Sequence, residues 1–110
     1  MKQLDPHTFA ALADPTRLAI LAALADGEKT VNEIAAPFAM SQPAISQHIK
    51  VLEKAGLIAR RVDGNKRPCR LVEDSFAELE EWANMMRKAF TANYNRLDRV
   101  LAEMSKGDTK

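Results

Sequence analysis

The stretch that decides the fold is SQPAISQHIKVLEKAGLIARRVDGNKRPCRL, residues 41–71. Its first part repeats apolar residues at the spacing of one helix face: Ile45, Ile49 and Leu52. This pattern predicts an amphipathic helix over 42–55, with Ser41 as its N-cap. The pair Asp63-Gly64 then predicts a tight turn within a two-stranded hairpin over 58–71. A helix followed directly by a hairpin is therefore the centre of the predicted fold.

Capping residues place three more helices before this stretch. An aspartate followed by proline starts each of the helices predicted over 5–13 and 15–25. Thr30 and a glutamate three residues later form a capping box, which predicts a short helix over 31–37. The helix over 15–25 is apolar almost all round and is expected to be the core element. Helices followed by a hairpin in this order are typical of a winged helix-turn-helix domain. We predict one such domain over 1–110, mainly α with a small β-hairpin.

A last, long helix is predicted over 75–106, because Ser75 and Glu78 match a capping box. At about 1.5 Å per residue, the stretch from Ser75 to Ser105 spans about 46 Å, which is more than a domain of this size can cover. Its apolar positions follow a seven-residue repeat, which indicates packing on the same helix of a second subunit in a homodimer. The predicted interface residues are Phe76, Leu79, Ala83, Met86, Phe90, Asn93, Leu97 and Val100. Asn93, the polar exception, either faces solvent near the end of the interface or fixes the register.

Composition and charge restrict the partners. Hydrophobic residues make up 46% of the chain and charged residues 28%, as in ordinary globular proteins. The net charge is only +1, yet residues 41–70 carry seven Lys or Arg against two Asp or Glu. A basic middle between two slightly acidic ends indicates an anionic partner bound by one face. No apolar run approaches the roughly 18 residues of a membrane span, and no signal-peptide core is visible, so we predict a cytoplasmic protein without membrane contact.

The predicted helix over 42–55 has a polar outer face opposite its packing face. Such residues suit the edges of bases in the DNA major groove, because glutamine pairs with adenine, serine with several bases, and lysine with guanine or phosphate. The predicted base-reading residues are Gln42, Pro43, Ser46, Gln47 and Lys50. The competing interpretation is an ordinary solvated face.

Basic side chains gather on the predicted hairpin. They are Arg60, Arg61, Lys66, Arg67 and Arg70. A basic hairpin beside a reading helix is suited to holding phosphates. The predicted phosphate contacts are Thr30, Asn65, Lys66 and Arg67. The alternatives are a solvated hairpin, or pairing of Arg60 or Arg61 with the acidic helix that begins near Glu73.

Three motifs resemble the ArsR/SmtB family of bacterial regulators. They are ADPTRLAIL at 13–21, SQPAISQHI at 41–49 and LEKAGLI at 52–58. The resemblance extends without an evident gap over most of the chain. It implies a homodimeric winged-helix repressor of transcription that binds a palindromic operator in double-stranded DNA, with the first and last helices at the dimer interface. Trp82, early in the last helix, resembles the pattern of the subgroup without metal sites. Met86 and Phe90 differ from it, because that subgroup often has Tyr and Trp at these positions.

The same family contains members that sense metals. They carry cysteines in the third helix, or carboxylate and histidine ligands on the last helix. Here the third helix has no cysteine and the last has no histidine, so we predict no metal site and no cofactor. The single cysteine, Cys69, is expected to pack inward, with redox control as the alternative. His48 is expected to be packed or to face phosphate. The sequence predicts no particular inducer.

Enzymatic activity finds no support, because the chain lacks a Gly-rich phosphate loop and a set of nucleophile and base. We therefore predict a sequence-specific, DNA-binding transcriptional regulator. One alternative is a winged-helix module whose outer face binds protein, although the wing arginines favour DNA. The other is a weakly specific nucleoid-type DNA binder, although the polar reading face favours base contacts.

Overall fold

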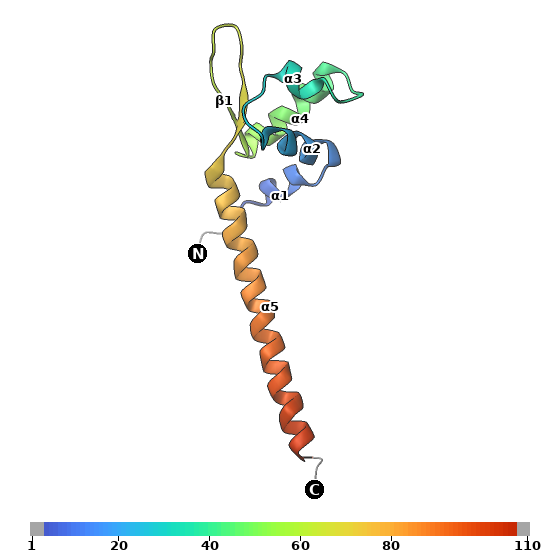
Figure 1. Cartoon of the computed structure of the whole chain (residues 1–110), viewed down its shortest axis with the longest axis vertical. Coiled ribbons are helices and arrows are strands. Elements are labelled where there is room, and N and C mark those ends of the chain that lie inside the picture. Colours follow the sequence, from blue (N-terminus) through green and yellow to red (C-terminus); the bar gives the residue numbers. More distant parts are fainter. Residues whose placement is uncertain (1–3, 108–110) are drawn as a thin grey trace. The chain divides into compact units, whose positions relative to one another are not determined.

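The computed structural model describes residues 4–107, and its side chains up to Ser105 (Figure 1). It contains five helices and one hairpin in that range: α1 (Pro6–Leu12), α2 (Pro15–Leu24), α3 (Val31–Ala35), α4 (Gln42–Lys54), β1 (Ile58–Arg60), β2 (Cys69–Leu71) and α5 (Glu73–Gly107). The predicted fold class, mainly helical with a small hairpin and a long C-terminal helix, is confirmed. The chain forms two units, a winged-helix body up to Ala77 and the remainder of α5 from Glu78.

The predicted helix starts of the body are confirmed by their caps. Each capping side chain accepts a backbone N–H of the first turn: Asp5 from His7, Asp14 from Arg17, Thr30 from Glu33, and Ser41 from Ala44. These bonds pair donors that a helix leaves free at its N-terminus. Local sequence therefore sets where the four short helices begin.

The core lies where α2 meets α1, α4 and β2. Its fully or almost fully buried apolar members are Ala11, Ile20, Leu21, Leu24, Ile34, Ile45, Ile49, Leu52, Leu57, Ile58 and Cys69. The helix α2 is the core element, as predicted, since Ile20, Leu21 and Leu24 are buried, but its apolar surface is only partly covered: Leu18 is 51% exposed, and Ala19 and Ala22 are also exposed. The reason is that α1, α4 and the hairpin cover only part of its circumference.

The hairpin is short and antiparallel, with Ile58 opposite Leu71 and Arg60 opposite Cys69. Cys69 also pairs with Lys29 on its other side, through N–H···O bonds of 2.8 and 3.1 Å. The segment before α3 is thereby fixed to the hairpin. As a result, the hairpin loop and α3 lie at the same end of the body (Figure 1).

The start of the long helix differs from the prediction. Ser75 was expected as its N-cap, but α5 begins at Glu73 and Ser75 lies inside it. The Ser75 hydroxyl instead donates to the carbonyl oxygen of Gly56, 2.5 Å away. Gly56 ends α4 in the left-handed conformation, with φ +80°. The hydroxyl is therefore used to pair a carbonyl at the end of α4, which local sequence does not reveal.

Candidate nucleic-acid interface

The reading helix α4 presents one buried face and one open face. On the buried face, Ile45, Ile49 and Leu52 are all 0% exposed, as predicted. On the open face, Gln42, Pro43, Gln47 and Lys50 are exposed and Ser46 is half-buried. Most of these residues lie in the first two turns of α4. Recognition helices contact base edges mainly through their N-terminal residues, so this half of α4 is suited to enter a major groove.

The first residue of α4 is tied to α3. The Gln42 Nε2 donates to Asn32 Oδ1 over 2.7 Å, and both residues are exposed. Sequence reasoning missed Asn32, since ten positions separate the two residues. A clue exists in the sequence, because Asn32 lies in the first turn of the helix that precedes the reading helix. The bond makes Asn32 part of the candidate interface.

Behind the open face, His48 points toward the N-terminus of α2. Its Nδ1 lies 3.3 Å from an Arg17 guanidinium nitrogen and 3.8 Å from the Asp14 carboxylate. Arg17 also donates to the carbonyl oxygens of Ala11 and Ala10, at 2.6 and 3.2 Å. The Arg17 N–H at the start of α2 holds the pKa of Asp14 below its usual value. Of the two orientations predicted for His48, the packed one is observed.

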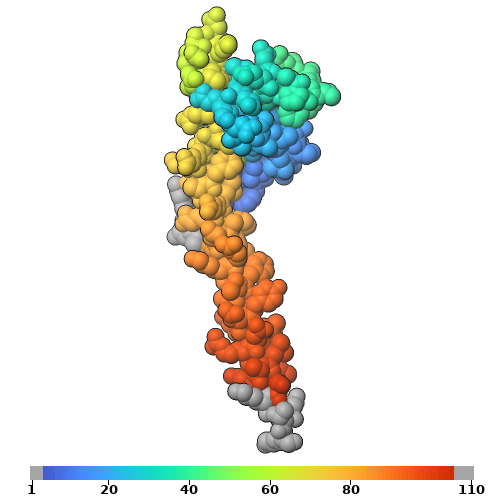
Figure 2. All heavy atoms as spheres, in the orientation of Figure 1, coloured from blue at the N-terminus to red at the C-terminus, as the bar shows by residue number. Residues whose placement is uncertain are grey.

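The hairpin loop projects from the body, as the yellow-green segment of Figure 2 shows. Asp63 and Lys66 exchange two backbone hydrogen bonds of 2.9 and 3.0 Å, which close the predicted turn. Gly64 occupies the left-handed region there, with φ +62°. The turn leaves the three predicted phosphate-binding residues of the loop exposed: Asn65, Lys66 and Arg67. This loop can therefore meet an anionic surface without any rearrangement of the core.

The two arginines at the end of β1 face acidic side chains of the protein itself. Arg60 is the last residue of the strand, and Arg61 follows it. Arg61 Nε lies 2.9 and 3.0 Å from the two carboxylate oxygens of Glu28. Arg60 Nε lies 3.6 Å from Glu53 and is buried without a hydrogen-bond partner. The alternative of pairing with the acidic start of the last helix is therefore wrong. Glu28 and Glu53 are nearer because Lys29 pairs with β2 and because α4 packs on β1.

Thr30 serves the capping box of α3. Its hydroxyl donates to Glu33 Oε1 at 3.0 Å and accepts the Glu33 N–H at 3.3 Å. Bonds from Thr30 hold the pKa of the Glu33 carboxyl below its usual value, and the charge of Lys66 contributes to this effect. The phosphate contact predicted for Thr30 requires its hydroxyl to give up the bond to Glu33.

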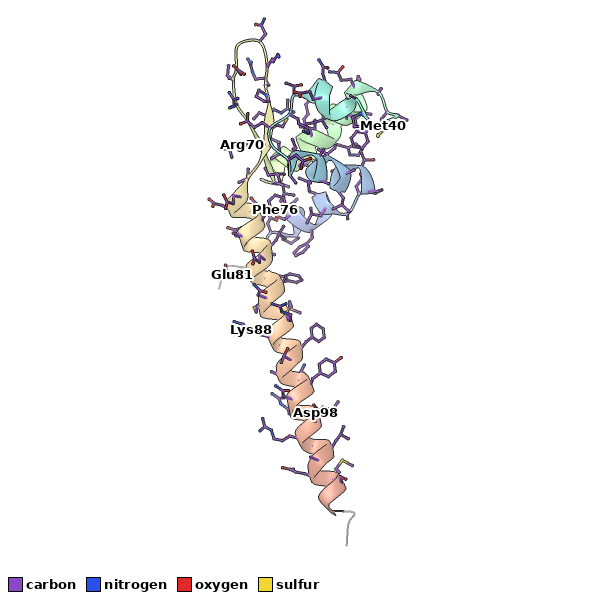
Figure 3. All side chains as sticks on the ribbon, in the orientation of Figure 1. Met40, Arg70, Phe76, Glu81, Lys88 and Asp98 are labelled. Atoms are coloured by element: carbon purple, nitrogen blue, oxygen red, sulfur yellow. The ribbon has the colours of Figure 1, made fainter. Side chains whose placement is uncertain are left out.

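Most of the predicted dimer residues of α5 are open, except at its start. Phe76 and Leu79 are half-buried, whereas Ala83, Met86, Phe90, Asn93, Leu97 and Val100 are exposed. Figure 3 labels Phe76, Glu81, Lys88 and Asp98 along this helix. Sequence reasoning missed Tyr94 and Leu101, which are 66% and 53% exposed. A strict seven-residue repeat omits them, but in a straight helix of 3.6 residues per turn they adjoin Phe90 and Leu97.

The described residues offer neither a metal site nor a membrane span. In residues 4–107, no group of three or more His, Cys, Asp or Glu is placed to hold a metal ion. Within the same range, no helix combines the length and apolar character that crossing a membrane requires.

Comparison with known proteins identifies relatives of this arrangement. The family model described as "Bacterial regulatory protein, arsR family" matches residues 14–60. An HTH-type transcriptional regulator of Mycobacterium tuberculosis is 45% identical over 73 residues, which are 66% of this chain and 68% of that protein. A biofilm growth-associated repressor of Agrobacterium fabrum is 40% identical over 70 residues, which are 64% of this chain and 60% of that repressor.

Solved structures of similar chains extend the comparison. The crystal structure of an ArsR family transcriptional regulator is 37% identical, with a TM-score of 0.73, and the match covers 78% of this chain and 94% of that one. A homodimeric winged helix-turn-helix DNA-binding domain from Mycobacterium bovis is 31% identical, with a TM-score of 0.61, and the match covers 76% and 82%. Both matches include most of the described body.

Proposed function

Because this chain belongs to the ArsR family of bacterial regulatory proteins, we propose that it is a transcriptional repressor that binds DNA as a homodimer. The observation that carries the proposal is the open polar N-terminal half of α4, together with an exposed basic hairpin loop on the same body. The relatives support repression and dimerisation, since one is named a repressor and another was solved as a homodimeric DNA-binding domain. Such a repressor acts in the cytoplasm, where the DNA is.

In this proposal α4 contacts base edges and reads the DNA sequence, and the hairpin loop binds the phosphate backbone of the DNA. The reading residues are Gln42, Pro43, Ser46, Gln47 and Lys50. Lys66 and Arg67, together with Asn65, contact phosphates, which contribute affinity and orientation but carry no sequence information. Thr30 is the weakest of the phosphate contacts, because its hydroxyl is engaged with Glu33. Arg61 is not a phosphate contact, because Glu28 neutralises it.

The second subunit determines the form of the operator. Two symmetry-related reading helices enter successive major grooves on one side of the duplex, about 34 Å apart. The two half-sites are then inverted repeats, so the operator is palindromic. The subunits join through the apolar side of α5, which in the described part of the chain remains open.

Two alanine variants separate reading from holding. An operator is first selected from random duplex DNA. Gln47→Ala is expected to cost about 1–3 kcal/mol on that operator and much less on unrelated DNA, because only base-specific bonds are lost. Lys66→Ala is expected to weaken binding to both duplexes equally. It also lowers the slope of log affinity against log salt by about 0.9 for each lost contact, and by about twice that for a dimer.

Lys88→Ala, on α5, removes the same charge as Lys66→Ala outside the candidate interface and serves as its control. It should leave the salt slope at the wild-type value. If Gln47→Ala and Lys66→Ala behave identically on both duplexes, the division between reading and holding is wrong. If the wild-type protein selects no preferred sequence, the proposal of a sequence-specific repressor fails.

A further inference from the structure

The hydrogen bond between Gln42 and Asn32 has no role in the core. Both side chains are exposed, and the two helices that carry them already pack through buried residues such as Ile34 and Ile45. The bond is nevertheless short, at 2.7 Å between Nε2 and Oδ1. It joins the first residue of the reading helix to the helix before it. Its position suggests that it serves the surface that α4 presents.

The chemistry of the bond leaves the Gln42 amide able to read a base. An amide group has two N–H donors and a carbonyl oxygen with two lone pairs. Asn32 takes one N–H, so one N–H and the carbonyl oxygen stay free. Adenine is recognised by one donor and one acceptor of the same amide in the major groove. The bond therefore fixes the orientation of the Gln42 amide without using the groups that adenine needs.

We propose that Asn32 is a positioning residue that holds the Gln42 amide for reading adenine, an inference that rests on the proposed function. Asn32 is well placed for this, because it lies in the first turn of α3, within the Thr30–Glu33 capping box. The capping box fixes the start of that helix, and the buried Ile34 anchors it to the body. Asn32 therefore acts from a rigid support.

The expected benefit is pre-organisation. A free glutamine samples several rotamers, and ordering such a side chain at an interface reduces affinity by about twofold to tenfold. Asn32 removes most of that loss before DNA is bound. The gain should appear only at the base pair that Gln42 contacts, since other reading residues do not touch Asn32.

The test is a double-mutant cycle with base preference as its readout. Binding of wild-type protein, Asn32→Ala, Gln42→Ala and the double variant is measured on the selected operator and on duplexes with each base at each position. Gln42→Ala should abolish the preference for adenine at one position in each half-site. Asn32→Ala should reduce the preference at the same position by about twofold to tenfold. In the Gln42→Ala background, Asn32→Ala should have no further effect.

A second variant tests the chemistry of the bond. Aspartate accepts the Gln42 N–H as asparagine does, so Asn32→Asp should keep the adenine preference while its charge weakens binding to all sequences. Asn95→Ala, an exposed asparagine on α5, is the matched control and should leave the preference unchanged. Thermal unfolding of each variant verifies that the body is folded.

Three outcomes overturn the inference. Equal effects of Asn32→Ala with and without Gln42 mean that Asn32 does not act through Gln42. Loss of the preference in Asn32→Asp means that an acceptor at position 32 is not what matters. An unchanged preference in Gln42→Ala means that Gln42 reads no base. In each case the wild-type protein still binds its operator, so the proposed function stands. Absence of any preferred sequence would overturn both.

Discussion

Cys69 illustrates how burial alters a single side chain. It lies opposite Arg60 in the hairpin and is 0% exposed. Burial raises the pKa of its thiol, and the charge of Arg60 only partly opposes this effect. The thiolate is the reactive form of cysteine, so both the higher pKa and the inaccessible sulfur reduce reactivity. This environment favours a packing role over redox control.

We predict that a thiol reagent labels Cys69 more slowly in the native protein than in the unfolded chain, by about two orders of magnitude or more, because the reaction requires local opening. The rates are compared at the same pH with and without denaturant. Mild oxidation should also leave operator affinity unchanged. Labelling of the native protein at the rate of the unfolded chain would contradict the prediction and restore the redox alternative.

Among the elements, the hairpin depends on contacts made outside its own two strands. Lys29 pairs with Cys69 through the backbone, and the neighbouring Glu28 binds Arg61 with both carboxylate oxygens. Exposed ion pairs of this kind contribute little to stability, about 0–1 kcal/mol. Their role here is to orient the hairpin, because they join its base to the segment that leads into α3.

Glu28→Ala tests this role of the ion pair. If Glu28 orients the hairpin, the variant should weaken binding to all DNA sequences by a few-fold while the midpoint of thermal unfolding changes little. If Arg61 is instead a phosphate contact restrained by Glu28, the variant should bind DNA more tightly. Asp26→Ala is the matched control, since it removes the same charge two residues earlier. Tighter binding by Glu28→Ala alone would contradict our interpretation.

For the molecule as a whole, the main feature is an apolar side of α5 that is exposed to solvent. Phe90, Tyr94, Leu97 and Leu101 follow spacings of three and four residues and are all more than half exposed. A continuous apolar stripe of this kind on a helix usually marks an interaction surface. A second copy of α5 offers the same stripe, so a symmetric pair buries both.

Phe90→Asp should convert the dimer into monomers or unfolded chain in analytical ultracentrifugation, because a charge buried at the interface is costly. Ala92→Asp adds the same charge two residues later. Since two residues correspond to a rotation of about 200° around the helix, Ala92 lies on the opposite side. That control should remain dimeric. A well-folded wild-type monomer at micromolar concentration would contradict the dimer itself.

The amino-acid sequence alone determined the local features. The caps at Asp14, Thr30 and Ser41, the turn at Gly64 and the two faces of α4 are all confirmed in the structure. Each depends on interactions within a turn or on the periodicity of one element, and nearby residues are sufficient to specify them. The exposed positions of Gln42, Pro43, Gln47 and Lys50 follow directly, because the apolar face of α4 fixes which residues point outward.

Only the tertiary structure decided which polar groups pair across the molecule. Asn32 meets Gln42 at a separation of 10 residues, Ser75 meets Gly56 at 19, and Arg61 meets Glu28 at 33. Each pairing depends on how α3 and α4 pack and on where the hairpin brings distant segments together. Local preferences carry no information about such contacts, since Ser75 satisfies a capping pattern equally well. Packing overrode that pattern because the hydroxyl could pair with a carbonyl at the end of α4.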